Sequence, residues 1–224
     1  MNRWYAISLL LTGLAFGGAY YTYQHRETLL PAKVPTHWGV NGEPDGWTAR
    51  DDMFWILMLP PLGMAGMNVL TLVLPWLSPK PFQIDGTNKA YYYLMFLIVA
   101  LFGIMGVILT LGYSDPSFPT AKWMIVAIGV VFMLLGNVLG QVPRNFWIGV
   151  RTPWTLANNT VWVKTHRLAA WLFVADGFIT AVLALVGAPF LLIFGVLITM
   201  AIIPVFYSLW LYKRLEREGK LEPA

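Results

Sequence analysis

The sequence predicts an all-α protein that crosses a membrane several times. Hydrophobic residues fill 58% of the 224 positions and charged residues 12%, whereas soluble domains average about 45–50% and about 25%. So few charged side chains cannot cover the surface of a soluble globule of this size. The apolar positions also gather in uncharged runs, and about 20 such residues cross a bilayer. We therefore expect a single polytopic membrane domain over residues 1–224.

Uncharged runs predict six transmembrane helices. A run over 168–212 contains one charged residue, Asp176. As one helix it would be about 68 Å long, which is twice the thickness of a membrane. Gly187-Ala188-Pro189 is the natural point for this run to fold back into two helices. Four further runs each predict one helix, at 4–24, 53–79, 90–114 and 123–143.

Basic residues orient these helices, because cytoplasmic loops carry more Lys and Arg. The two termini and the second and fourth loops contain eleven Lys and Arg, whereas the other loops contain four. This bias predicts that both termini are cytoplasmic. It places the loop at 24–52 outside the cytoplasm and the loop at 142–167 inside it. The net charge of +4 is explained by this topology and by membrane lipid, and we expect no direct contact with nucleic acid.

The extracytoplasmic loop at 24–52 is predicted to form a small cap. Asn41-Gly42 and Asp45-Gly46 are turn dipeptides, so residues 36–38 and 47–48 are predicted to pair as a short hairpin. In this interpretation the aromatic side chains of the loop rest on the helix bundle.

A second hypothesis for the same loop is a cation site. Four oxygen ligands fall at positions 1, 3, 5 and 12 of a calcium-loop template, namely Asn41, Glu43, Asp45 and Asp52. The match is degenerate, because Asp52 stands where the template has a bidentate Glu. The chain has no Cys, which excludes thiolate metal sites. We therefore expect no cofactor and no metal, and we keep these four residues as the candidate set.

The cytoplasmic loop at 142–167 combines helix-capping residues with basic ones. Thr152, directly before a proline, predicts a helix start, and Asn158 or Asn159 is the predicted cap of the next helix. On that helix Trp162 and His166 lie one turn apart and share a face. Four basic residues suit either lipid headgroups or an acidic cytoplasmic partner: Arg144, Arg151, Lys164 and Arg167.

Asp176 is the one acidic residue inside a predicted span. A carboxylate there costs several kcal/mol unless it is paired or protonated. One hypothesis makes it a gate, a proton site or a partner contact. The other gives it a hydrogen bond to an amide of a neighbouring helix, such as Asn68, Asn137 or Gln141. The sequence has no nucleophile and base at a recognisable spacing and no paired carboxylates within the spans, so we expect no enzyme.

The two long loops resemble a known family. Residues 146–156 read FWIGVRTPWTL and residues 161–167 read VWVKTHR, a pattern that strongly resembles the SdpI family of bacterial immunity proteins. Residues 35–38 read PTHW and residues 45–47 read DGW. These are similar to the domain of unknown function that usually precedes the SdpI segment.

This resemblance implies a multi-pass protein of the bacterial cytoplasmic membrane. It implies protection from a secreted toxin peptide that depolarises membranes, and sequestration of a cytoplasmic repressor when that toxin is present. The outer loop would then face the toxin, through His37, Trp38, Asp45 and Trp47. The inner loop would bind the cytoplasmic partner, through Arg144, Arg151, Thr152, Trp154, Trp162, Lys164, His166 and Arg167.

The alternative function is a small transporter or channel. Its polar pathway would run through three polar residues within the predicted spans, Asp176, Asn137 and Asn68. Substrate flux that disappears with Asp176→Asn would favour transport over binding. A metal-responsive protein built on the outer loop is a third hypothesis, and calcium-dependent stabilisation lost with Asp45→Ala would favour it.

Overall fold

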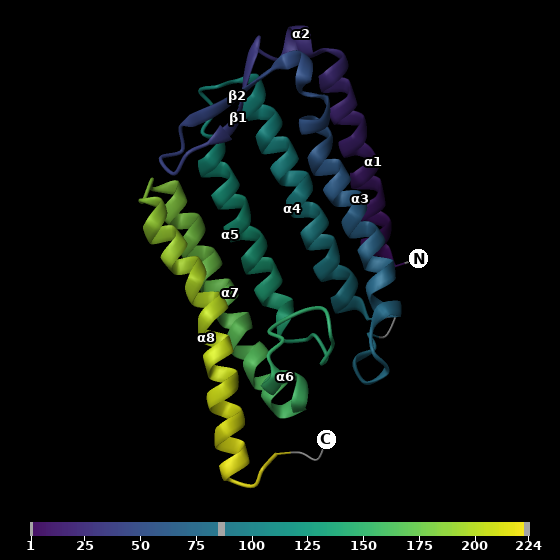
Figure 1. Ribbon diagram of the computed structural model, residues 1–224, viewed down its shortest axis with the longest axis vertical. Helices are drawn as coiled ribbons and strands as arrows, with labels where there is room; N and C mark the ends of the chain where they lie inside the picture. The colour runs from purple at the N-terminus through teal and green to yellow at the C-terminus, as the bar shows by residue number, and fades with distance from the viewer. Residues whose placement is uncertain (1, 85–87, 222–224) are drawn as a thin grey trace.

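The computed structural model describes residues 2–84 and 88–221. Within them the chain forms six long helices (Figure 1), which are α1 (Arg3–Gln24), α3 (Phe54–Leu77), α4 (Lys89–Ser114), α5 (Thr120–Leu139), α7 (Asn159–Leu185) and α8 (Phe190–Arg217). The shorter elements are α2 (Arg26–Leu29), α6 (Pro153–Ala157) and the 3-10 turns η1 (Arg50–Asp52) and η2 (Lys80–Phe82). The long helices alternate in direction, so α1 begins and α8 ends at the end of the bundle away from the hairpin.

Five helices of the described chain are long and apolar enough to cross a membrane, namely α3, α4, α5, α7 and α8. This confirms the prediction of a largely helical polytopic membrane protein. Helix α1 has 22 residues but is not among the five, so the sixth span stays a prediction. Its buried residues include Ser8, Thr12 and Thr22, whereas Leu10 and Leu14 are each 64% exposed. These inward-facing hydroxyl residues lower the hydropathy of α1.

The long run at 168–212 folds back at the predicted point. Helix α7 ends at Leu185 and α8 begins at Phe190. Between them Gly187 has a φ of 74°, a left-handed conformation that glycine adopts without steric cost. The predicted helical hairpin is therefore confirmed.

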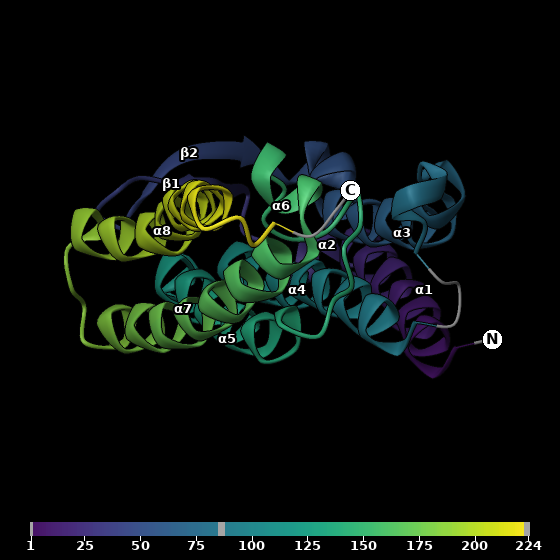
Figure 2. The same cartoon turned by 90° about the horizontal axis from the view of Figure 1, so that it is seen from below.

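The six long helices form two groups of three. Helices α1, α3 and α4 contact one another, α7 packs against α5 and α8, and contacts between α4 and α5 join the two groups. Figure 2 shows the groups side by side. In the second group α5 and α7 approach very closely, because a Cβ at Gly129 would lie 2.6 Å from the carbonyl oxygen of Gly177. Small residues at such a crossing allow the two backbones to meet.

A two-stranded antiparallel hairpin lies over one end of the first group. It comprises β1 (Lys33–Trp38) and β2 (Pro44–Ala49), and Val34 pairs with Thr48. The predicted hairpin is thus present, with longer strands than the sequence indicated. Its register differs from the prediction, because residues 47 and 48 pair with residues 35 and 34 and not with 36–38. The hairpin is anchored by a buried apolar cluster that ties it to α3 and α4, comprising Leu30, Val34, Met53, Leu57 and Tyr113.

Candidate functional site

The signature loop, residues 142–167, is folded by its own side chains. The amide nitrogen of Asn145 donates to the carbonyl oxygens of Pro143 and Ile148, at 2.9 and 3.1 Å. The amide oxygen of Asn145 accepts from the backbone N–H groups of Trp147 and Ile148, at 2.8 and 2.7 Å. All four bonds come from one buried side chain, which is 1% exposed. Asn145 therefore fixes the path of the chain where it leaves α5, a role that the sequence did not reveal.

His166 clamps the middle of this loop onto α7. Its Nε2 accepts a hydrogen bond from the backbone N–H of Val150 at 3.0 Å, and its Nδ1 lies 2.8 Å from the carbonyl oxygen of Trp162. These two contacts assign a neutral imidazole with its proton on Nδ1. Gly149 has a φ of 106°, and a Cβ there would lie 2.1 Å from His166 Nε2. Only glycine therefore fits at position 149, beside the imidazole ring of His166.

Two threonines build the turn that enters α6. Thr152 caps α6, and its backbone N–H donates to Thr155 Oγ1 at 2.9 Å. Thr155 Oγ1 donates in turn to the carbonyl oxygen of Val150 at 2.7 Å. The hydroxyls of Thr152 and Ser208 are 3.0 Å apart, which ties the turn to α8. The predicted helix start at Thr152 is confirmed, and Asn158, not Asn159, caps α7.

Two tryptophans fasten the loop to other helices. The indole N–H of Trp162 donates to the carbonyl oxygen of Val142 at 2.9 Å. The indole N–H of Trp147 donates to Ser78 Oγ at 2.9 Å, at the end of α3. Trp162 also stacks on His166 with ring centroids 3.9 Å apart, which confirms that the two residues share a face.

The predicted partner-binding residues divide into buried and exposed sets. Thr152, Trp162 and His166 are 8%, 1% and 0% exposed, so their side chains hold the loop together. The exposed residues of the set are all basic, namely Arg151, Lys164 and Arg167. Trp154 and Arg144 are partly buried, and Arg144 donates to the carbonyl oxygen of Leu156 at 3.2 Å and lies over the ring of Phe82.

The β1–β2 hairpin exposes most of its motif residues to solvent. His37 and Asp45 are paired across the strands and are both exposed. Trp47 is 50% exposed. Trp38 instead stacks on Tyr113 of α4, with ring centroids 6.2 Å apart. Three of the four predicted toxin-facing residues are thus accessible, and Trp38 belongs to the anchor of the hairpin.

The base of the hairpin is joined to α2 by an ion pair. The guanidinium Nε of Arg26 donates to Asp51 Oδ1 at 3.0 Å. This hydrogen bond is the main reason that the pKa of Arg26 is raised above its ordinary value. The pair is exposed, so its contribution to stability is small.

The four candidate cation ligands do not assemble. The side-chain oxygen of Asn41 accepts from the backbone N–H of Glu43 at 3.2 Å, Asp45 pairs with His37, and Asp52 lies in η1 beyond the second strand. Among the residues that the structure describes, no three His, Cys, Asp or Glu side chains are grouped so that they could hold a metal ion.

The three residues suggested for a polar pathway lie apart. Asp176 is 7% exposed and accepts a hydrogen bond from Thr199 of α8 at 2.5 Å. Asn68 donates to Thr12 of α1 at 2.8 Å, and the side chain of Asn137 is exposed. The partner of Asp176 is thus not one of the amides that the sequence suggested.

Sequence reasoning missed Thr199, although a signal for it was present. In a helical hairpin, residues at equal separations from the turn lie opposite each other. Asp176 is eleven residues before Gly187, and Thr199 is eleven residues after Ala188. This symmetry about the turn would have predicted the pair.

Comparisons with known proteins place the chain in a family. It is 30% identical over 217 residues to Immunity protein SdpI of Bacillus subtilis (strain 168), which covers 93% of this chain and 96% of that protein. The chain belongs to the SdpI family. The SdpI/YfhL protein family matches residues 141–208, and a Domain of unknown function (DUF1648) matches residues 10–64. No solved structure matches the chain.

The two family segments correspond to the two motif regions of the structure. The SdpI/YfhL segment contains the signature loop, α7 and most of α8, and therefore includes the pair of Asp176 and Thr199. The preceding segment contains most of α1, the hairpin and the first part of α3. The resemblance read from the sequence is confirmed for both segments.

Proposed function

We propose that this protein is a membrane immunity protein of the bacterial cytoplasmic membrane, which binds a secreted, membrane-depolarising toxin peptide. The observation that carries the proposal is the relationship to an immunity protein over almost the full length of both chains. A role in binding rather than catalysis agrees with the kind of function for which that family is named.

In this proposal the chain spans the membrane six times and both termini are cytoplasmic. The alternating direction of the long helices supports it, as does the excess of Lys and Arg at the termini and in the second and fourth loops. Helix α1 has 22 residues and is therefore about 33 Å long, enough to cross the hydrocarbon layer. The hairpin then lies outside the cytoplasm.

The toxin would be bound at the hairpin. Trp47 is 50% exposed, and next to it the paired His37 and Asp45 offer a polar contact. An exposed aromatic side chain beside a charged pair suits an amphipathic peptide that arrives at the membrane surface.

A cytoplasmic repressor would be bound at the signature loop. The exposed residues of the predicted set, Arg151, Lys164 and Arg167, suit an acidic protein surface. Anionic lipid headgroups are their other natural partner. The buried Thr152, Trp162 and His166 would act indirectly, because they hold the loop in the conformation that presents these cations.

The test is the membrane potential of a toxin-sensitive bacterium, followed with a potential-sensitive dye. Cells with and without the protein are challenged with a depolarising peptide, preferably one encoded beside the gene. We expect the potential to hold only in cells that contain the protein. Equal collapse in both cell types, with the protein inserted in the membrane, would contradict immunity to that peptide.

Transport is the second candidate function, and the burial of Asp176 within α7 favours it. Against it, Asp176 and Asn68 bond to different helix pairs and form no shared pathway. Purified protein in vesicles distinguishes the two functions, because ion flux that is lost with Asp176→Asn is expected of a transporter and not of a binding protein.

A further inference from the structure

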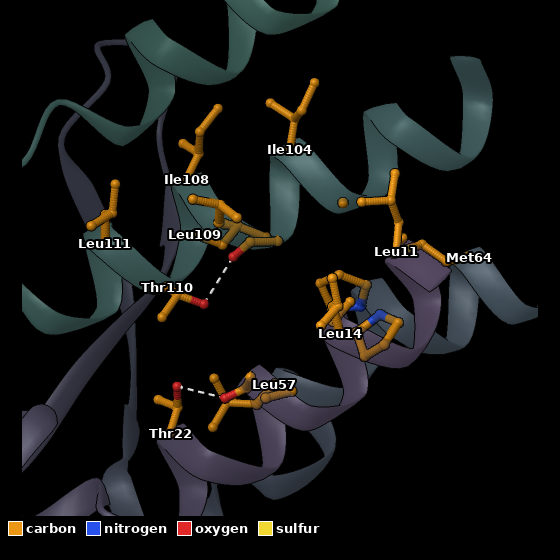
Figure 3. A pocket seen from close by; sticks show the side chains of 18 of the residues that line it. Leu11, Leu14, Thr22, Leu57, Met64, Ile104, Ile108, Leu109, Thr110 and Leu111 are labelled. Atoms are coloured by element: carbon orange, nitrogen blue, oxygen red, sulfur yellow. Dashed lines mark hydrogen bonds between the residues drawn. The ribbon is translucent and has the colours of Figure 1, made fainter. Parts of the chain in front are cut away.

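A cavity of about 720 Å³ lies between α1, α3 and α4. Its wall is formed by residues 11–22 of α1, 56–64 of α3 and 100–113 of α4 (Figure 3). These are the parts of the three helices that lie nearer the hairpin. Leu57 and Tyr113 line the cavity and also belong to the apolar cluster that anchors the hairpin. An occupant would therefore touch the support of the outer cap.

The two threonine hydroxyls that line the cavity already use their donor hydrogens within their own helices. Thr22 donates to the carbonyl oxygen of Gly18 at 3.0 Å, and Thr110 donates to that of Gly106 at 2.8 Å. Both bonds stay within one helix, as the dashed lines in Figure 3 show. Among the described residues that line the cavity, none is charged. Apart from these two hydroxyls and that of Tyr113, the lining side chains are apolar. A site of this kind favours hydrocarbon, since a polar ligand would lose more hydrogen bonds to water than it could regain.

The cavity opens onto the exposed apolar surface of α1 and α4, which would face lipid. Three of its lining residues are also strongly exposed: Leu14 is 64% exposed, Val107 62% and Leu111 48%. They lie on α1 and α4, and α4 is long and apolar enough to span the membrane. The occupant therefore enters sideways from the bilayer.

The length of the cavity matches one leaflet of a bilayer. Residues 11–22 of α1, which line it, extend over about 17 Å, close to half of the roughly 30 Å hydrocarbon layer. The bilayer supplies acyl chains of this length directly at the opening of the cavity, which favours an acyl chain over an apolar peptide as its occupant.

We propose that this cavity binds a hydrocarbon chain of a phospholipid from the leaflet next to the hairpin. The bound chain packs against Leu57 and Tyr113 and so supports the hairpin from below. The inference does not depend on the immunity function, because it follows from the shape, chemistry and opening of the cavity alone.

The test uses the full chain in vesicles of phosphatidylglycerol and phosphatidylethanolamine that contain a phospholipid with a photoreactive diazirine on its acyl chain. After illumination, mass spectrometry of peptides locates the labelled residues. We expect label at inward-facing lining residues such as Leu57 and Met64, which are only 3% and 1% exposed. Label confined to outward residues such as Leu9 and Leu10, 43% and 64% exposed, would overturn the proposal.

Two neighbouring glycines of α1 provide a matched pair of variants. A Cβ at Gly17 or at Gly18 would meet nothing within 4 Å, but only Gly18 lines the cavity. Leucine at position 18 therefore fills the cavity without a clash, whereas leucine at position 17 does not enter it. We expect Gly18→Leu to lower the labelling of Leu57 and Met64 about tenfold, since the added carbons displace a similar number of chain carbons.

In the Gly17→Leu variant, the lipid probe should label Leu57 and Met64 as strongly as in the unmodified protein. Ala15→Leu, at a second lining position of α1, replaces Gly18→Leu if that variant does not fold. Undiminished inner labelling in a folded cavity-filling variant would overturn the proposal. So would inner labelling by an apolar helical peptide that carries the same diazirine and excludes the lipid probe.

Discussion

The signature loop and the outer hairpin both contain family motifs, but their motif side chains do different work. In the loop, Asn145 and His166 are buried and bond to the backbone of the loop itself. In the hairpin the strands are held by backbone pairing, and His37 and Trp47 extend outward. The comparison teaches that the inner motif specifies a conformation, whereas the outer motif forms a surface. Substitutions of the buried residues of the loop should therefore damage folding, whereas substitutions on the exposed surface of the hairpin should damage recognition.

The largest effect is expected for Gly149→Ala. The new Cβ would overlap His166 Nε2, and the φ of 106° is strained for alanine. Strain of this kind and overpacking each cost roughly 1–3 kcal/mol, so we expect the free energy of unfolding to fall by about 3 kcal/mol. Denaturant unfolding of the purified protein in detergent micelles measures it.

Gly219→Ala is the matched control for that variant. Gly219 also has a positive φ, 64°, but a Cβ there meets nothing within 4 Å. The free energy of unfolding of Gly219→Ala should therefore fall only by the cost of the strained backbone conformation, about 1 kcal/mol. If the two variants lose the same stability, the contact between Gly149 and His166 is not what restricts the loop.

A smaller loss is expected for His166→Phe. Phenylalanine cannot accept from Val150, so a buried N–H loses its partner at a cost of about 1–3 kcal/mol. His25→Phe provides the comparison, because His25 makes the same contact with the carbonyl four residues earlier but is exposed. It should change the free energy of unfolding by less than about 0.5 kcal/mol. Protease sensitivity of the loop gives a second readout, and a His166→Phe loop as resistant as the unmodified one would contradict the clamp.

The sequence predicted the parts of both regions that depend on local patterns. Uncharged runs located the long helices, turn dipeptides located the hairpin, and Thr152 before a proline located the start of α6. The bond between His166 and Val150 could not be predicted, because it depends on how the loop passes over α7. The bonds of Asn145 are local, but they depend on the irregular backbone path of residues 143–148, which no regular pattern in the sequence specifies. The cavity could not be predicted either, since it forms between three separate helices whose packing the sequence does not specify.

Asp176 lies in α7, which begins in the signature loop and runs toward the hairpin end of the bundle. Substitution of Asp176 therefore tests whether the loop and the hairpin are coupled. Asn at this position can still accept from Thr199, and we expect Asp176→Asn to retain its stability. Asp176→Leu should lose about 1 kcal/mol, as is usual for a single hydrogen bond between membrane helices. If Asp176→Asn changes neither protection nor repressor binding, the charge does not couple the two faces.

The smallest effect on stability, and the sharpest on function, is expected for Trp47→Ala. Half of the Trp47 side chain is exposed, so its removal should change the free energy of unfolding by less than about 0.5 kcal/mol. If the hairpin surface binds the toxin, an aromatic anchor of this kind contributes about 2 kcal/mol to binding, and its loss weakens binding roughly thirtyfold. The toxin concentration that halves the membrane potential should fall accordingly.

Trp76→Ala separates recognition from a general effect of losing a surface tryptophan. Trp76 is 79% exposed at the opposite end of α3, where a toxin from outside does not reach it. Protection should therefore remain at the level of the unmodified protein. If both variants protect equally well, the hairpin is not the toxin-binding surface. The signature loop would then still be a motif that specifies a conformation, but the hairpin would not be a motif for recognition.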